Sequence, residues 1–119
     1  EEGCGFFFGK DGNTRQVTHF LETENVFAGE RKRRFSIRPE DYLLAEQFAL
    51  ENELDLLGIY HSHPNHPAIP SETDRLNAVP WFSYLIITTT ITGATEARSW
   101  QLNPAGTFEE ERLIEHATI

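Results

Sequence analysis

The hydrophobic positions of this chain fall into short runs separated by turn-forming residues, a pattern typical of strands. Phe6, Phe7 and Phe8 lie between glycines at 5–9, a run too short for a helix, and they predict a buried strand. Residues 55–63 are almost continuously apolar up to their last three, which predicts a central strand covered on both faces. Similar runs bounded by Gly, Pro, Asn or Asp predict strands at 15–24, 35–37, 83–92 and 96–102, with a last strand or frayed terminus at 107–114.

A helical pattern lies between the strands predicted at 35–37 and 55–63. Pro39 suits the first turn of a helix, and the acidic residues Glu40 and Asp41 favour its positive N-terminal end. We expect this helix to span 39–53 and to face the sheet with one apolar stripe, made by Leu44, Ala45, Phe48 and Ala49. A rigid loop, Pro64–Pro70, follows the central strand, and a second, short helix is predicted from Ser71.

The resulting order of elements, β-β-β-α-β-α-β-β-β, predicts an α/β (α+β) fold in which helices flank a central mixed β-sheet. A length of 119 residues corresponds to a single domain, spanning 1–119.

Composition narrows the classes of function. With 10 Lys+Arg against 19 Asp+Glu, the net charge of −9 argues against binding to nucleic acid. The chain has neither an apolar run long enough to span a membrane nor a signal peptide, so we expect no membrane association and a cytoplasmic location. The one cysteine, Cys4, excludes an internal disulfide and is typical of strand packing. Because there is no methionine, we expect a trimmed form of a longer product.

Two histidines end the predicted central strand and are the strongest candidates for chemistry. His61 and His63 are two residues apart, so their imidazoles point to the same face of the sheet. Two imidazoles and one carboxylate form a ligand set of catalytic zinc sites, and Asp74, in the first turn of the helix from Ser71, is the candidate carboxylate. The segment 71–74 (Ser-Glu-Thr-Asp) equally fits a capping box in which Asp74 bonds back to Ser71. Both interpretations of Asp74 remain open at this point.

Other readings of the polar residues fit less well. A zinc hydrolase barrel needs about 250 residues, and a small β-barrel metalloprotein would need a glutamate soon after the His-x-His pair and a third histidine, for which only His116 near the end is available. His66 is typical of an exposed loop histidine. The basic cluster Arg31–Arg34 is typical of a solvated loop, with steering of an acidic partner as the alternative.

Together, the candidate residues resemble the signature of the JAMM/MPN+ metalloproteases (the Mov34/MPN/PAD-1 group), particularly its small prokaryotic members. That signature is His-x-His-Pro followed by Ser-x-x-Asp, with ten residues between the second His and the Asp, as at 61–64 and 71–74 here. Residues 2–5 (Glu-Gly-Cys-Gly) resemble the family's Glu-x-x-Gly segment ahead of a buried strand. The resemblance implies a cytidine deaminase-like architecture, with a strand and a helix ahead of the glutamate that we expect to be missing from this chain.

The resemblance also implies a role for each residue. His61, His63 and Asp74 would bind Zn²⁺, Glu2 would act as general base toward water, and Ser71 would donate a hydrogen bond to the developing oxyanion. The implied reaction is hydrolysis of an amide or isopeptide bond.

The implied substrate is the flexible C-terminal tail of a ubiquitin-like or sulfur-carrier protein, an extended segment that can add to a sheet edge. Two other functions remain open: a non-catalytic MPN scaffold that binds partners, and the branch of the same superfold linked to DNA repair. The complete ligand set argues against the scaffold, and the acidic charge argues against the DNA-repair branch. Nothing in the sequence indicates an oligomeric state.

Overall fold

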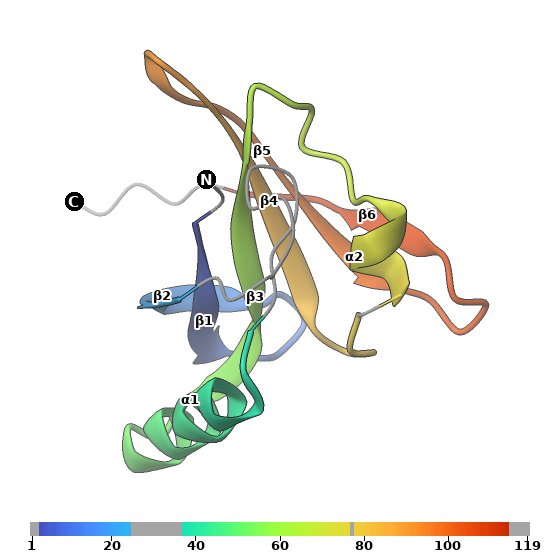
Figure 1. The fold of residues 1–119 in the computed structure, drawn as a ribbon. Coiled ribbons are helices and arrows are strands. Elements are labelled where there is room, and N and C mark those ends of the chain that lie inside the picture. The colour runs from blue at the N-terminus through green and yellow to red at the C-terminus, as the bar shows by residue number, and fades with distance from the viewer. Residues whose placement is uncertain (1–2, 25–36, 77, 115–119) are drawn as a thin grey trace.

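A six-stranded sheet forms the frame of the protein (Figure 1). The computed structural model describes residues 3–24, 37–76 and 78–114. In chain order, the strands are β1 (Cys4–Lys10), β2 (Gln16–Thr23), β3 (Asp55–Pro64), β4 (Ser83–Thr90), β5 (Gly93–Leu102) and β6 (Phe108–Glu111). Their order in the sheet is β2-β1-β3-β4-β5-β6, and β3–β4 is the parallel pair while the other neighbours are antiparallel. The predicted α+β fold with a mixed sheet is therefore confirmed.

The apolar run of β3 places it at the centre of the sheet, between β1 and β4. Leu57 and Ile59 are buried, as the near-continuous apolar pattern predicts. Gly58 is required for close approach, because a Cβ atom at this position would lie 1.8 Å from the backbone oxygen of Ser83 on β4. The strand that carries both histidines is thus held tightly by its neighbours on either side.

Helix α1 (Pro39–Glu51) begins at the predicted proline and packs on the sheet. Ala45 and Ala49 are buried against a core that includes Phe6, Phe8, Ile59 and Tyr84. The prediction that Leu44 belongs to the buried stripe is wrong, since 58% of its surface is exposed. Tyr42 packs on the core instead, because positions 42, 45 and 49 share one helix face while Leu44 is rotated by about 100° from Ala45.

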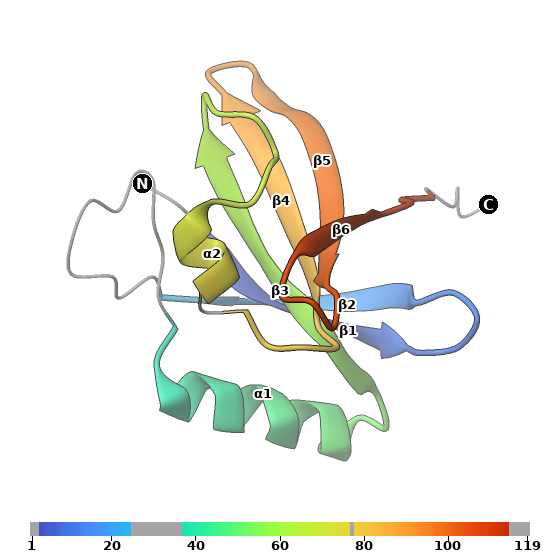
Figure 2. The same cartoon turned by 90° about the vertical axis from the view of Figure 1, so that its right-hand side faces the viewer.

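Helix α2 (Glu72–Leu76) follows the proline-rich loop, as expected for a helix capped by Ser71. Along β3 successive side chains alternate, so His61 and His63 continue the face that Ile59 presents to α1. Both described helices consequently lie over this face of the sheet (Figure 2). On the other face, the ring of Phe20 on β2 contacts Phe7 on β1 in a tilted arrangement and Tyr60 on β3 edge to face, with ring centroids 6.2 and 5.6 Å apart.

The remaining elements end within a few residues of their predicted bounds. Pro64 is the last residue of β3, rather than the first of the loop, because a strand can end on a residue that donates no N–H. β6 covers only Phe108–Glu111, so the segment predicted at 107–114 is a short strand. Of the strand predicted at 35–37, Ile37 lies outside any strand and the other two residues lie outside the described part of the chain. Neither described helix has the length and apolarity needed to cross a membrane.

Candidate metal centre

The C-terminal end of β3 brings two buried imidazoles together. His61 is fully buried and His63 is 7% exposed. Their Nε2 atoms lie 2.9 Å apart, as expected for side chains two residues apart on a regular strand. The prediction that both rings point to the same face is confirmed.

Asp74 reaches the same point from the first turn of α2. Its Oδ2 atom lies 3.6 Å from Nε2 of His61 and 3.9 Å from Nε2 of His63. The same oxygen accepts a hydrogen bond of 2.8 Å from the N–H of Ser71, and the Asp74 N–H donates to Oγ of Ser71 over 3.1 Å. The capping box is therefore formed, and it orients Asp74 toward the histidines. The two interpretations of Asp74 are compatible.

These three donors fit a metal ion of the size and preference of zinc. His61, His63 and Asp74 offer one ligand atom each, all within 4.8 Å of one another. The separations of 2.9, 3.6 and 3.9 Å define a triangle whose centre is roughly 2.0 Å from each atom, close to the usual Zn–N and Zn–O bond lengths. Two neutral nitrogens and one carboxylate oxygen also match the donor set of catalytic zinc sites, which keep one position for water.

A backbone carbonyl orients the ring of His63. Its Nδ1 atom lies 3.0 Å from the carbonyl oxygen of Pro67, which can only accept, so Nδ1 carries the proton. The neutral ring then has its lone pair on Nε2, the atom that faces Asp74. This is the arrangement that ligating histidines commonly adopt.

Electrostatics keep His63 and Asp74 in their metal-binding forms. Burial lowers the pKa of His63, and neighbouring His61 lowers it further, whereas the bond to Pro67 opposes the shift. Burial acts to raise the pKa of Asp74, but the interactions with His61 and the hydrogen bonds from Ser71 outweigh it, so the pKa lies below its usual value. At neutral pH the site therefore presents an uncharged His63 and an ionised Asp74.

The predicted general base, Glu2, lies outside the described residues. Its neighbour Gly3 donates its N–H to Oγ of Ser62 over 2.9 Å and accepts the Ser62 N–H over 2.9 Å. Because Ser62 stands between His61 and His63, the described chain begins beside the strand that carries both histidines. Ser71, the predicted oxyanion donor, is bound into the capping box of Asp74.

The other residues considered from the sequence are not part of this group of three donors. Cys4 is buried in β1, with Sγ 3.8 Å from the carbonyl oxygen of Thr23, which agrees with a packing role. His66 is an exposed loop residue. Arg31–Arg34 and His116 lie outside the described part of the chain. The role of the Pro67 carbonyl could not be predicted from the sequence, because every residue has a backbone carbonyl and no residue type marks the one that binds His63.

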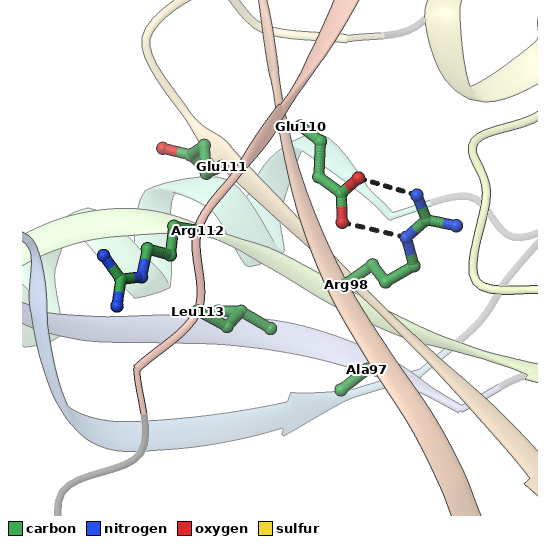
Figure 3. A pocket seen from close by; sticks show the side chains of 6 residues that line it. All are labelled: Ala97, Arg98, Glu110, Glu111, Arg112 and Leu113. Atoms are coloured by element: carbon green, nitrogen blue, oxygen red, sulfur yellow. Dashed lines mark hydrogen bonds and ion pairs between the residues drawn. The ribbon is translucent and has the colours of Figure 1, made fainter.

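A surface pocket of about 410 Å³ lies elsewhere, formed by β5, β6 and the segment that follows β6 (Figure 3). It is lined by Ala97, Arg98, Glu110, Glu111, Arg112 and Leu113. Arg98 and Glu110 neutralise each other through two hydrogen bonds of 2.6 and 2.9 Å. The pocket shares no residue with the three metal donors, so it is not the candidate centre.

Comparison with known proteins identifies relatives that cover the candidate centre. The sequence profile of a family described as prokaryotic homologues of the JAB domain matches residues 1–103, which include all the predicted site residues. A desampylase from Pyrococcus furiosus is 28% identical over 113 residues, which are 95% of this chain and 75% of the relative. A desampylase from Haloferax volcanii is 32% identical over 99 residues, covering 83% of this chain and 69% of the relative.

Two solution structures share the fold. A protein from Salinibacter ruber is 35% identical with a TM-score of 0.72, covering 98% of this chain and 78% of that protein. A protein from Desulfitobacterium hafniense is 33% identical with a TM-score of 0.79, covering 95% of this chain and 77% of that protein.

Proposed function

Since this chain belongs to the family of prokaryotic homologues of the JAB domain, as its JAMM-like motif predicts, we propose that it is a zinc-dependent isopeptidase. The observation that carries the proposal is the convergence of His61, His63 and Asp74 within 3.9 Å at the end of β3. The proposed bond is the amide that joins the C-terminal tail of a ubiquitin-like or sulfur-carrier protein to an amine. Two relatives are named desampylases, and we take that name as support for this class of reaction.

The chain's own residues have separate tasks in this proposal. A zinc ion bound by the three donors would lower the pKa of water to roughly 7 and polarise the scissile carbonyl. Glu2 would take a proton from the attacking water and pass it to the leaving amine. The hydroxyl of Ser71 accepts from the Asp74 N–H, so its own proton is left to donate to the oxyanion of the tetrahedral intermediate.

Hydrolysis of a defined conjugate tests the proposal. The zinc-loaded protein is incubated with ubiquitin-like and sulfur-carrier proteins whose C-terminal glycine is joined to the lysine of a reporter peptide. Intact mass spectrometry should show the carrier and the peptide released with the mass of one water added. Glu2→Gln should retain zinc and lose about 10²–10⁴ in rate, the usual contribution of a general base.

The neighbouring carboxylate provides a matched control, because Glu1→Gln removes the same charge one residue away and should leave the rate unchanged. If Glu2→Gln hydrolyses the conjugate at the wild-type rate, the general-base assignment is wrong. If the protein binds zinc and carrier but releases nothing from any conjugate, the non-catalytic scaffold is the better description.

A further inference from the structure

The ring of His63 depends on the loop that follows β3. Its Nδ1–H donates to the carbonyl of Pro67, four residues further along the chain. That loop has no helix or strand of its own between Asn65 and Ser71. The position of the Pro67 carbonyl must therefore be set by contacts from other elements.

Side chains of β4 and β5 supply those contacts. The N–H of Ala68 donates to Oε1 of Glu96 over 3.1 Å, and its carbonyl accepts from Nε1 of Trp100 over 3.0 Å. Ala68 is fully buried, so both of its backbone groups depend on these partners. On the other side of Pro67, Oγ1 of Thr88 donates to the carbonyl of His66 over 2.6 Å.

The sheet register places these side chains level with the histidine. His63 is paired with Thr88 across β3 and β4, and Thr88 is paired with Glu96 across β4 and β5. Three neighbouring strands thus contribute one residue each to a row that runs under the loop. This row depends on the register of the parallel β3–β4 pair and of the antiparallel β4–β5 pair, which aligns residues that are far apart in the sequence.

The peptide unit between Pro67 and Ala68 joins the two ends of this row. In a planar trans peptide the C=O and the N–H point in opposite directions. The carbonyl of this unit accepts from His63, while its N–H donates to Glu96. A carboxylate that binds the N–H consequently fixes the direction of the carbonyl and polarises it, which strengthens its hydrogen bond to the imidazole.

We infer that Glu96 is a positioning residue of the metal centre, which acts on His63 through the Pro67–Ala68 peptide. The Glu96 carboxylate binds the peptide N–H, and the carbonyl of the same peptide binds the imidazole of His63. This chain of two hydrogen bonds keeps the proton of His63 on Nδ1 and its lone pair on Nε2. It extends the common carboxylate–histidine–metal arrangement by one peptide unit. Trp100 and Thr88 support it by holding the adjacent carbonyls. The inference rests on the proposed function only in that His63 is taken as a metal ligand.

The test compares Glu96→Ala, which removes the acceptor, with Glu96→Gln, which keeps an acceptor oxygen at the same place. Zinc affinity is measured by competition with a chelator, and the tautomer of His63 by ¹⁵N NMR of the metal-free protein. Glu96→Ala should weaken zinc binding about 10- to 100-fold, the usual effect of losing an outer partner of a ligating histidine. It should also populate the second His63 tautomer, while Glu96→Gln should recover most of both properties.

Two further variants separate positioning from folding. Glu22→Ala removes an exposed glutamate on β2, an edge strand separated from β5 by β1, β3 and β4, and should match the wild type in both measurements. Trp100→Phe removes the indole N–H and should shift both readouts in the same direction as Glu96→Ala. If Trp100→Phe fails to fold, the comparison of Glu96→Ala with Glu96→Gln decides the matter.

The inference is overturned if Glu96→Ala binds zinc within twofold of the wild type and keeps the Nδ1–H tautomer. It is also overturned if Glu96→Gln is as impaired as Glu96→Ala, because the bond to the Ala68 N–H would then not be the cause. Failure of the wild type to bind zinc would instead overturn the proposed function, and the tautomer of the metal-free protein would still decide the role of Glu96.

Discussion

Replacing Asp74 by asparagine separates its two roles, because the amide keeps the shape of the side chain but removes its charge. An Asn oxygen can still accept from the Ser71 N–H, so the capping box should largely survive. The loss of charge near the N-terminus of α2 should cost at most about 1 kcal/mol in the absence of metal. The metal site, in contrast, loses the one anion among its three donors.

The size of the effect on zinc binding follows from the donor count. Loss of an outer partner costs 10- to 100-fold in affinity, so loss of a direct donor should cost at least about 100-fold. At free zinc of 100 times the wild-type Kd, binding stabilises the wild type by about 2.7 kcal/mol. For a chain of this length this corresponds to a rise in Tm of about 10 °C. The Asp74→Asn protein should gain less than about 0.5 kcal/mol, or about 2 °C, at the same zinc concentration.

Differential scanning calorimetry with and without zinc, and again after chelation, measures these shifts. Glu46→Gln, at an exposed position of α1, is the control for the change in net charge and should respond to zinc like the wild type. A rise in Tm of Asp74→Asn equal to that of the wild type would refute the reasoning, since the carboxylate would then not take part in binding.

Three other substitutions test the surrounding structure. Ser71→Ala removes the hydroxyl that caps α2, so it should cost about 1 kcal/mol of stability and weaken zinc binding, measured by urea unfolding and chelator competition; unchanged affinity would contradict the orienting role of the capping box. Gly58→Ala should destabilise the protein by about 1–3 kcal/mol in urea, because its Cβ would collide with the Ser83 carbonyl; a neutral result would contradict the close approach. Arg38 donates a hydrogen bond to Asp41 and lowers the pKa of that carboxyl group. A carboxyl group whose pKa is lower in the folded than in the unfolded protein stabilises the fold at pH values above its unfolded pKa of about 4. That stabilisation is lost as the pH falls through the folded-state pKa. Arg38→Ala should therefore be destabilising at neutral pH and nearly neutral at strongly acidic pH, and an equal effect at both would contradict the pairing.

The parts of the fold that follow from short-range patterns could be predicted from the sequence. Alternation places His61 and His63 on one face of β3 because the side-chain period of a strand is two. The apolar run around Leu57 and Ile59 identifies the central strand, since only a strand covered on both faces is apolar throughout. The capping motif at Ser71 predicts where α2 begins, because its hydrogen bonds join residues only three apart.

The parts that depend on tertiary contacts could not be predicted in this way. Leu44 fits a buried stripe by spacing, yet the orientation of α1 on the sheet packs the partly buried Tyr42 against the core instead. Glu96 and Trp100 hold the loop after β3 from about thirty residues away, and neither belongs to a local motif. Their role arises from the register of β3, β4 and β5, which depends on pairing across the whole sheet.

The location of bound zinc tests the account most directly. Anomalous diffraction from crystals of the zinc-loaded protein, recorded on both sides of the zinc absorption edge, should show one strong peak per chain. We predict that the peak lies about 2.0–2.2 Å from Nε2 of His61, Nε2 of His63 and a carboxylate oxygen of Asp74. A peak at any other group of residues, with the two imidazoles still hydrogen-bonded to each other, would contradict it.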